Sequence, residues 1–246
     1  MMTRMHAPEP QQSDGRPLDA LRPYSITTGF VPHAAGSALI RAGDSHVLCV
    51  ASVLESVPRW MEGRGLGWVT GEYSMLPYAT LPRSAREQGA PSGRTQEIRR
   101  LIGRSLRMAV DRRALGERTI VVDCDVLQAD GGTRTASVTG GYVALALALQ
   151  QLRQQGILDA DPLQRQIAAV SVGIVEGQAM LDLAYADDVQ AEVDLNVVMT
   201  GTGEYVEVQG TGEGAPYSRE ALERLLTLAD AGIAQLMTIQ KEALDG

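Results

Sequence analysis

Five consecutive residues, Gly131-Gly132-Thr133-Arg134-Thr135, combine chemical groups that suit binding of an anion. Glycines allow backbone N–H groups to close around a phosphate, and a helix N-terminus adds partial positive charge. Thr133 adds a hydroxyl, and Arg134 adds a planar set of donors. The segment therefore predicts a phosphate cradle, although simple helix initiation also fits it. No Gly-Lys-Ser/Thr follows, which excludes a Walker A loop.

A second set of candidate residues is acidic. Asp182 ends an apolar run, and Asp188 follows six residues later across an expected bend, with Asp187, Glu192 and Asp194 close by. The carboxylates of Asp182 and Asp188 can therefore converge on a hard cation such as Mg²⁺, or supply a general acid. A solvated acidic turn is the alternative. Phosphoryl-type chemistry needs both an anion cradle and a cation site, and this chain offers candidates for each.

Hydrophobic periodicity predicts the elements that must position these residues. Alternating apolar residues over 38–53 indicate two strands of a hairpin, interrupted at Gly43-Asp44. A strand is expected over 119–128, and a helix of small apolar residues over 136–152. The glycine turn of the cradle lies between them. The order is therefore strand, glycine turn, helix.

The second half of the chain repeats this order more loosely. Its expected strands span 168–175, 178–183, 192–199 and 205–209. A final helix over 218–243 begins at Ser218, a residue type that caps helix N-termini. The expected fold is therefore α+β, with mixed β-sheets packed against helices and two related β-then-α units.

Length and composition indicate a globular protein. With 246 residues and 44% hydrophobic composition, the chain can bury a large core. We expect residues 1–15 to form a disordered tail and residues 16–246 a single domain. Cys49 and Cys124 lie in strand-like runs and are expected to be buried thiols. Because neither a membrane span nor a secretory signal is found, the expected compartment is the cytoplasm.

Charge is distributed unevenly along the chain. The net charge is −8, yet residues 82–118 contain ten arginines and four acids, so this stretch carries +6 and the remainder −14. Arg83 and Arg86 lie in a loop over 82–93, and other arginines line one face of a helix expected over 98–109. Guanidinium groups pair bidentately with phosphate oxygens, so the stretch is a candidate RNA-binding surface. For the helix, a solvated face or a subunit contact fits equally well.

Long segments of the chain also resemble bacterial ribonuclease PH, a family also called tRNA nucleotidyltransferase. The resemblance extends from Arg16 to the C-terminus and is carried by RPYSITTGFVPHAAGSALI, GDSHVLCVASV, GWVTGEYSMLP, SGRTQEIRRLIGRSLR, DCDVLQADGGTRTASVTGGYVALA, AEVDLNVVMTG and EVQGTGEGAPYSREAL. It implies the ribonuclease PH fold and phosphorolysis, in which inorganic phosphate attacks the last phosphodiester of an RNA and releases a nucleoside diphosphate. It also implies the reverse reaction, which adds nucleotides from diphosphates.

The resemblance assigns roles to individual residues. The phosphate ligands that it implies are Arg94, Gly132, Thr133 and Arg134. Asp182 and Asp188 match the acids that serve catalysis and bind Mg²⁺ or Mn²⁺. Independently of the resemblance, the position of Arg83 and Arg86 in the loop just before Arg94 leads us to expect that they contact RNA that enters the site.

The resemblance also implies substrates and an assembly. The substrates are tRNA precursors and other RNA 3′ ends, and the assembly is a homohexamer, a trimer of dimers. The alternative is a catalytically silent RNA-binding ring subunit of an exosome-like assembly. Retention of both arginines and both aspartates favours the enzyme.

Overall fold

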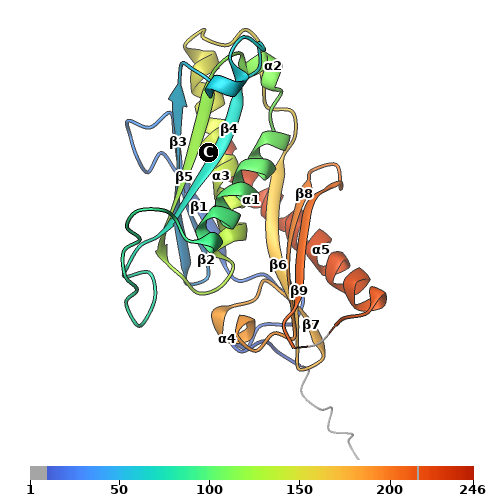
Figure 1. Ribbon diagram of the computed structural model, residues 1–246. Helices are drawn as coiled ribbons and strands as arrows, with labels where there is room; N and C mark the ends of the chain where they lie inside the picture. Colours follow the sequence, from blue (N-terminus) through green and yellow to red (C-terminus); the bar gives the residue numbers. More distant parts are fainter. Residues whose placement is uncertain (1–9, 215) are drawn as a thin grey trace, which may run out of the picture.

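The computed structural model describes residues 10–214 and 216–246, which form two β-sheets with helices between and beside them (Figure 1). The first sheet has the order β1-β2-β3-β5-β4, with β4 and β5 parallel and the other pairs antiparallel. The second sheet is antiparallel, in the order β7-β6-β8-β9. The strands are β1 (Tyr24–Thr28), β2 (Gly36–Ala42), β3 (Ser45–Leu54), β4 (Trp68–Met75), β5 (Thr119–Gln128), β6 (Ile167–Val175), β7 (Gln178–Leu181), β8 (Val193–Thr200) and β9 (Tyr205–Gly212).

Helix α3 is the central element of the core. It packs against β2, β3 and β5 of the first sheet and against β6 of the second, so most of its residues are buried. A helix enclosed in this way is apolar on all sides. Helix α1 packs on β4 beside α3, and α5 covers β6 and β7. The helices are α1 (Gly93–Met108), α2 (Arg112–Leu115), α3 (Thr133–Gln154), α4 (Tyr185–Asp188) and α5 (Arg219–Asp245), with a 3₁₀ helix at Arg59–Met61.

Glycines let α3 approach the first sheet closely. A Cβ at Gly140 would lie 2.7 Å from Cγ2 of Ile40, and a Cβ at Gly36 would lie 2.1 Å from the carbonyl oxygen of Ala144. Contacts this short leave no room for a side chain. The close packing holds the N-terminus of α3 beside the end of β5, where the expected cradle lies.

Most of the expected elements are confirmed, and the fold is α+β. The hairpin turns at Gly43, whose φ is +54°. Helix α5 begins as expected, because the Ser218 hydroxyl accepts from the N–H of Ala221 at 3.2 Å. Cys49 and Cys124 are buried free thiols. Within the described residues, no helix is long and apolar enough to cross a membrane.

Strands β1 and β4 were not among the expected elements, and the expected disordered tail differs from the structure. Strand β1 was not predicted, since its five residues carry a weak alternating pattern. The glycine-rich segment after residue 61 contains a full strand of eight residues, β4. Of the expected disordered tail, residues 1–9 lie outside the described residues, but residues 10–15 are ordered. The Gln12 side chain there is buried, and its amide donates to the carbonyl of Leu181 at 3.0 Å.

Candidate active site

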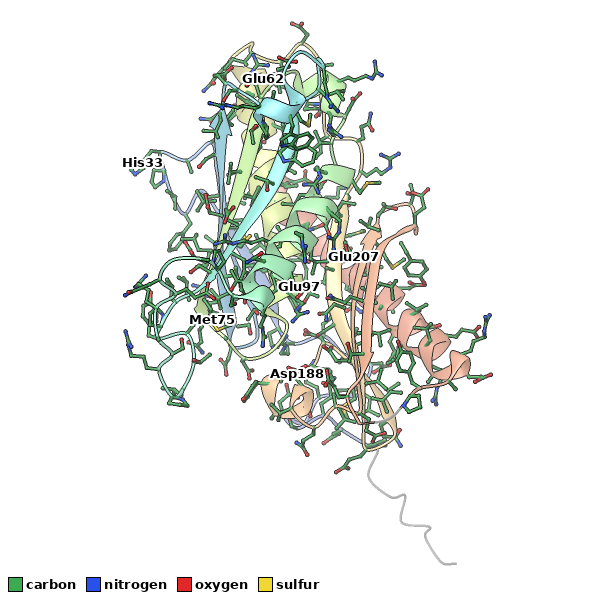
Figure 2. All side chains as sticks on the ribbon, viewed as in Figure 1. His33, Glu62, Met75, Glu97, Asp188 and Glu207 are labelled. Atoms are coloured by element: carbon green, nitrogen blue, oxygen red, sulfur yellow. The ribbon has the colours of Figure 1, made fainter. Side chains whose placement is uncertain are left out.

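A cavity of about 600 Å³ lies where three segments of the chain meet. The first turn of α1 contributes Arg94, the start of α3 contributes Thr133 and Arg134, and the region from α4 to β8 contributes Asp188 and Asp194. In Figure 2, Asp188 on α4 lies at the end of α1 that carries Glu97. The cavity therefore collects basic and acidic side chains from both halves of the chain.

The expected cradle forms the turn that starts α3. Gly131 and Gly132 have φ values of +74° and +63°, a region that favours glycine. A Cβ at Gly131 would lie 2.6 Å from the carbonyl oxygen of Leu183, so the turn packs directly on the segment that leads to α4. Among the described residues, no side chain caps the first turn of α3. Its N–H groups and the partial positive charge of a 22-residue helix are therefore available to an anion.

The two predicted phosphate-binding arginines both line the cavity beside this turn. Arg134 is held by Gln209 and Glu97: its Nη1 lies 3.1 Å from Gln209 Oε1 and 3.5 Å from Glu97 Oε2. Gln209 in turn donates to Glu97 at 2.9 Å. Arg94 lines the cavity from the first turn of α1. The structure thus brings together Arg94 with Gly132, Thr133 and Arg134 in one cavity, and their role as phosphate ligands stays a prediction.

Two carboxylates share the cavity with these arginines. Burial raises the pKa of Asp188, and the nearby Arg134 and Arg94 oppose this rise. Burial and the charge of Asp188 raise the pKa of Asp194 to about 6. Both acids are partly buried, and the nearby arginines do not fully offset the effect of burial on the pKa of either carboxyl. Paired carboxylates in this state are suited to a cation.

Asp182 is not part of this cavity, which corrects the prediction that it converges with Asp188. Its side chain is fully buried, and its two oxygens accept hydrogen bonds from Arg22 and Tyr24. Strand β7 ends at Leu181, and Asp182 adopts a φ of +57°, so its carboxylate is directed to Arg22 rather than to Asp188.

The partner of Asp188 in the cavity is Asp194, which the sequence analysis did not select. Two features of the sequence indicate Asp194. Asp194 also stands six residues from Asp188, and it lies on β8 two residues before Asn196. Strand alternation directs residues two apart to the same face, and both Asp194 and Asn196 line the cavity.

The loop arginines lie at the mouth of the cavity. Ser84 and Ala85 line it, and Arg83 and Arg86 on either side of them are exposed. Glu87 ties the loop to the first turn of α1, because its carboxylate accepts from the Thr95 hydroxyl at 2.9 Å. Arg83 and Arg86 are therefore accessible to a ligand that enters the cavity.

The two cavity acids are of a type that binds divalent cations. Among the described residues, no group of three or more His, Cys, Asp or Glu side chains is placed to hold a metal ion. Asp188 and Asp194 supply two carboxylates, and Mg²⁺ is commonly bound by one or two carboxylates together with substrate phosphates.

Comparison with known proteins gives consistent matches. Residues 20–149 match the 3′ exoribonuclease family, domain 1, and residues 165–232 match domain 2 of the same family. Ribonuclease PH from Mycobacterium sp. (strain KMS) is 58% identical over 238 residues, which covers 96% of this chain and 92% of that protein. Ribonuclease PH from Rhodococcus erythropolis (strain PR4 / NBRC 100887) is 58% identical over 236 residues, covering 95% and 90%.

Solved structures share the fold at low sequence identity. A chain of the Archaeoglobus fulgidus exosome with RNA bound to the active site gives a TM-score of 0.80 at 21% identity, covering 93% of this chain and 92% of that one. Rice (Oryza sativa) Rrp46 gives a TM-score of 0.77 at 20% identity, covering 95% and 100%.

Proposed function

The chain belongs to the ribonuclease PH family of 3′ exoribonucleases, and we propose that it trims the 3′ ends of tRNA precursors and other RNAs with this cavity. It is a phosphorolytic nucleotidyltransferase: inorganic phosphate is the co-substrate and a nucleoside diphosphate is the product. One observation carries the assignment of the site. The N-terminus of α3 and two arginines share a single cavity with two carboxylates.

The attacking phosphate binds at the start of α3. Backbone N–H groups of the Gly132–Arg134 turn, the Thr133 hydroxyl and the guanidinium groups of Arg94 and Arg134 surround one volume. The Thr133 hydroxyl lies 2.9 Å from that of Tyr73, which fixes its position. Donors held in place in this way orient the phosphate and neutralise its charge.

Asp188 and Asp194 would hold Mg²⁺ or Mn²⁺. A cation bound there would supply charge neutralisation at the phosphoryl oxygens. Without it, the two carboxylates repel both each other and the RNA. Asp182 accepts hydrogen bonds from Arg22 and Tyr24 and does not line the cavity, and its predicted part in catalysis and cation binding stays a prediction.

The chemical step needs no water. An oxygen of inorganic phosphate forms a bond to the terminal phosphorus as the bond to the 3′ oxygen of the preceding nucleotide breaks. Hydrogen phosphate carries one proton at neutral pH, and this proton balances the leaving 3′ hydroxyl. The protein positions the reacting groups and neutralises their charge, since phosphoryl transfer needs little covalent catalysis.

We extend the proposal to the organisation of the protein. Residues 16–246 act as a single domain, a view supported by the core around α3, which includes Ile167 and Val198 of the second sheet. The assembly is a homohexamer, a trimer of dimers, in the cytoplasm. Arg83 and Arg86 contact the RNA at the mouth of each cavity. A catalytically silent ring subunit is disfavoured, because two arginines and two carboxylates, Arg94, Arg134, Asp188 and Asp194, share one cavity.

The test uses a 3′-extended tRNA incubated with the purified protein, with and without inorganic phosphate. We expect nucleoside diphosphates that appear only when phosphate is present. Asp188→Asn should release none, and the matched control Asp159→Asn, at an exposed position outside the cavity, should behave as wild type. Release of nucleoside monophosphates without phosphate would contradict the proposal in favour of hydrolysis.

A further inference from the structure

An exposed tyrosine stands beside the cavity acid Asp188. Helix α4 spans Tyr185–Asp188, and its single turn continues to Val189, whose N–H donates to the Tyr185 carbonyl at 3.1 Å. Residues three and four apart in a helical turn lie on the same face. Tyr185, Asp188 and Val189 therefore share one face of α4, and all three line the cavity.

This face of α4 carries two large apolar side chains besides the carboxylate. Tyr185 is 61% exposed and Val189 is 59% exposed, whereas Asp187 in the same turn is buried. Leu81, in the loop before α1, is 98% exposed and lines the same cavity. Exposed apolar side chains that gather at a cavity indicate contact with the apolar part of a ligand. The apolar parts of an RNA are the flat faces of its bases.

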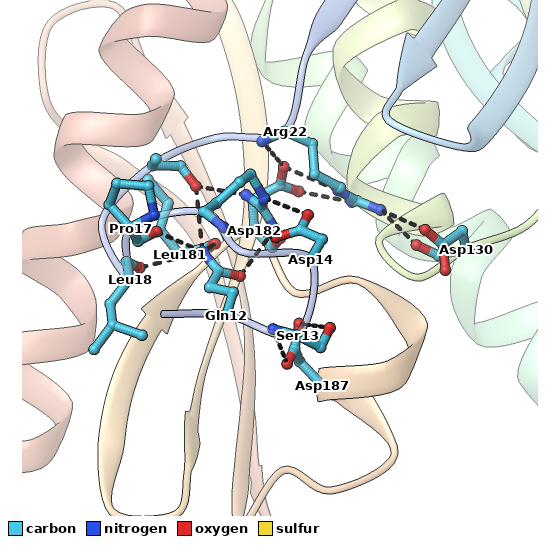
Figure 3. A network of polar contacts seen from close by, with 12 residues as sticks. Gln12, Ser13, Asp14, Pro17, Leu18, Arg22, Asp130, Leu181, Asp182 and Asp187 are labelled. Carbon is cyan, nitrogen blue, oxygen red and sulfur yellow. Dashed lines mark hydrogen bonds and ion pairs between the residues drawn. The ribbon is translucent and has the colours of Figure 1, made fainter. Parts of the chain in front are cut away.

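Contacts of its backbone and of its buried side hold α4 in place. The N–H of Tyr185 donates to Oδ1 of Asp130 at 3.2 Å, and a Cβ at Gly131 would lie 2.9 Å from the Tyr185 nitrogen. On the buried side, Asp187 accepts from the N–H of Ser13 at 3.1 Å and from its hydroxyl at 2.8 Å (Figure 3). The start of α4 therefore lies against the phosphate cradle, while the Tyr185 ring stays accessible from the cavity.

The position of Tyr185 matches that of the last base of a bound RNA. Side chains three residues apart on a helix have Cβ atoms about 5–6 Å apart, so Tyr185 lies close to Asp188. In the proposed function, the phosphodiester that breaks lies between the cradle and Asp188. A single ribose joins the last base to this phosphodiester. The base is therefore within reach of the Tyr185 ring.

We propose that the aromatic ring of Tyr185 stacks on the base of the last nucleotide and so holds the terminal phosphodiester beside Asp188. This rests on the proposed function, because it names the group that places the RNA end in that cavity. Every base has a π-face, so stacking on an aromatic side chain tolerates any sequence. An enzyme that removes successive nucleotides from different RNA ends needs a contact of this kind.

Two substitutions separate the ring from its hydroxyl. Tyr185→Ala removes the ring, and Tyr185→Phe keeps the ring without the hydroxyl. Loss of base–aromatic stacking commonly weakens binding by about 5- to 150-fold, and for one exposed ring we expect a fall of about tenfold in kcat/KM for RNA. Tyr185→Phe should restore most of this loss. The KM for phosphate should stay unchanged in Tyr185→Ala, because Arg94 and Arg134 remain in the cavity.

The experiment combines these variants with RNAs that lack one base. Three short 5′-labelled RNAs are compared for the first cleavage at saturating phosphate: an unmodified RNA, one whose last nucleotide carries 1′-deoxyribose without a base, and one with this change at the preceding nucleotide. Removal of the last base should lower kcat/KM about tenfold for the wild type and no further for Tyr185→Ala, because both changes delete the same contact. Tyr205→Ala, at an exposed tyrosine of β9 outside the cavity, is the control.

The other outcomes contradict the proposal. If Tyr185→Ala loses as much rate on the RNA without its last base as on the unmodified RNA, the ring does not contact that base. If the two losses overlap only for the preceding nucleotide, the ring stacks on a different base. A loss in Tyr185→Phe as large as in Tyr185→Ala would assign the effect to the hydroxyl. Failure of the proposed function is separate, because the wild-type protein would then form no diphosphates from the unmodified RNA.

A photochemical crosslink tests the same contact without any substitution, so the proposal stays testable if Tyr185→Ala does not fold. A short RNA that ends in 5-iodouridine is bound to the wild-type protein with Mg²⁺ and without phosphate, so that it is not phosphorolysed. Irradiation links 5-iodouracil to an aromatic side chain stacked on it, and mass spectrometry of the peptides identifies the linked residue. We expect this residue to be Tyr185. A link to Tyr78, which is 64% exposed, or no link at all would overturn the proposal.

Discussion

Asp194→Asn should inactivate the protein and at the same time stabilise its fold. Burial and the nearby charge of Asp188 raise the pKa of Asp194 from 3.8 to about 6. A carboxyl group with a raised pKa binds its proton more tightly in the folded than in the unfolded chain. Its ionised form therefore lowers the free energy of unfolding at neutral pH, and asparagine removes this cost.

The size and pH range of the effect follow from the same values. The interval from 3.8 to about 6 corresponds to about 3 kcal/mol at about 1.4 kcal/mol per pH unit. Because the side chain keeps partial contact with solvent, we expect about half of this. This loss of unfolding free energy is absent below pH 3.8, where Asp194 is protonated in both the folded and the unfolded chain. It develops as the pH rises from 3.8 to about 6, the pKa values of Asp194 in the unfolded and the folded chain, and is complete above about pH 6.

Urea unfolding measures this prediction. Wild type and Asp194→Asn are compared from pH 4 to pH 8 at one protein concentration, in EDTA and without phosphate, with exposed Asp159→Asn as the control. The gain in unfolding free energy should grow from near zero at pH 4 to about 1–2 kcal/mol above pH 6. A gain that is independent of pH, or a loss of stability, would refute the reasoning that Asp194 is desolvated beside Asp188.

Three further predictions concern the cavity and its mouth. Arg134→Lys and Arg94→Lys should each lower the rate of phosphorolysis by about 10²–10³, although the charge is retained. If either variant keeps the wild-type KM for phosphate and the wild-type kcat, the replaced arginine does not bind phosphate. Asp188→Asn should abolish turnover and keep assembly and RNA binding, whereas loss of soluble assembly would indicate a structural role. Replacing both Arg83 and Arg86 by alanine should weaken tRNA binding and reduce its log–log salt slope by about 0.7–0.9 per lost phosphate contact. Trimming of a very short RNA should stay unchanged, and equal salt slopes would exclude RNA contact by this loop.

Local patterns were enough to predict most elements and the glycine turn that starts α3, whereas Arg94 was selected only through the resemblance to a known family. The strand at 119–128, the glycine turn and the helix after it are adjacent in sequence, so composition and spacing fix their order. Thr133 and Arg134 follow directly from that turn. The sequence also predicted the buried thiols of Cys49 and Cys124, because both lie in alternating strands.

The acidic half of the cavity depended on contacts that spacing does not reveal. Asp182 and Asp188 have the expected separation, but a positive φ at Asp182 and the guanidinium of Arg22 direct the first carboxylate away from the cavity. The partner residue lies 160 positions earlier in the chain. No local pattern indicates such a pairing. The order of residues 10–15 was not predicted for the same reason, since their contacts are with residues far away in the sequence.

The most direct test of the central claim follows the added phosphate into the product. The protein is incubated with a 3′-extended tRNA, Mg²⁺ and ³²P-labelled inorganic phosphate, and the released nucleotides are separated and counted. Phosphorolysis forms the bond between this phosphate and the departing nucleotide, so each nucleoside diphosphate should carry the label at its terminal phosphate. Unlabelled nucleoside monophosphates, released at the same rate without added phosphate, would contradict the account.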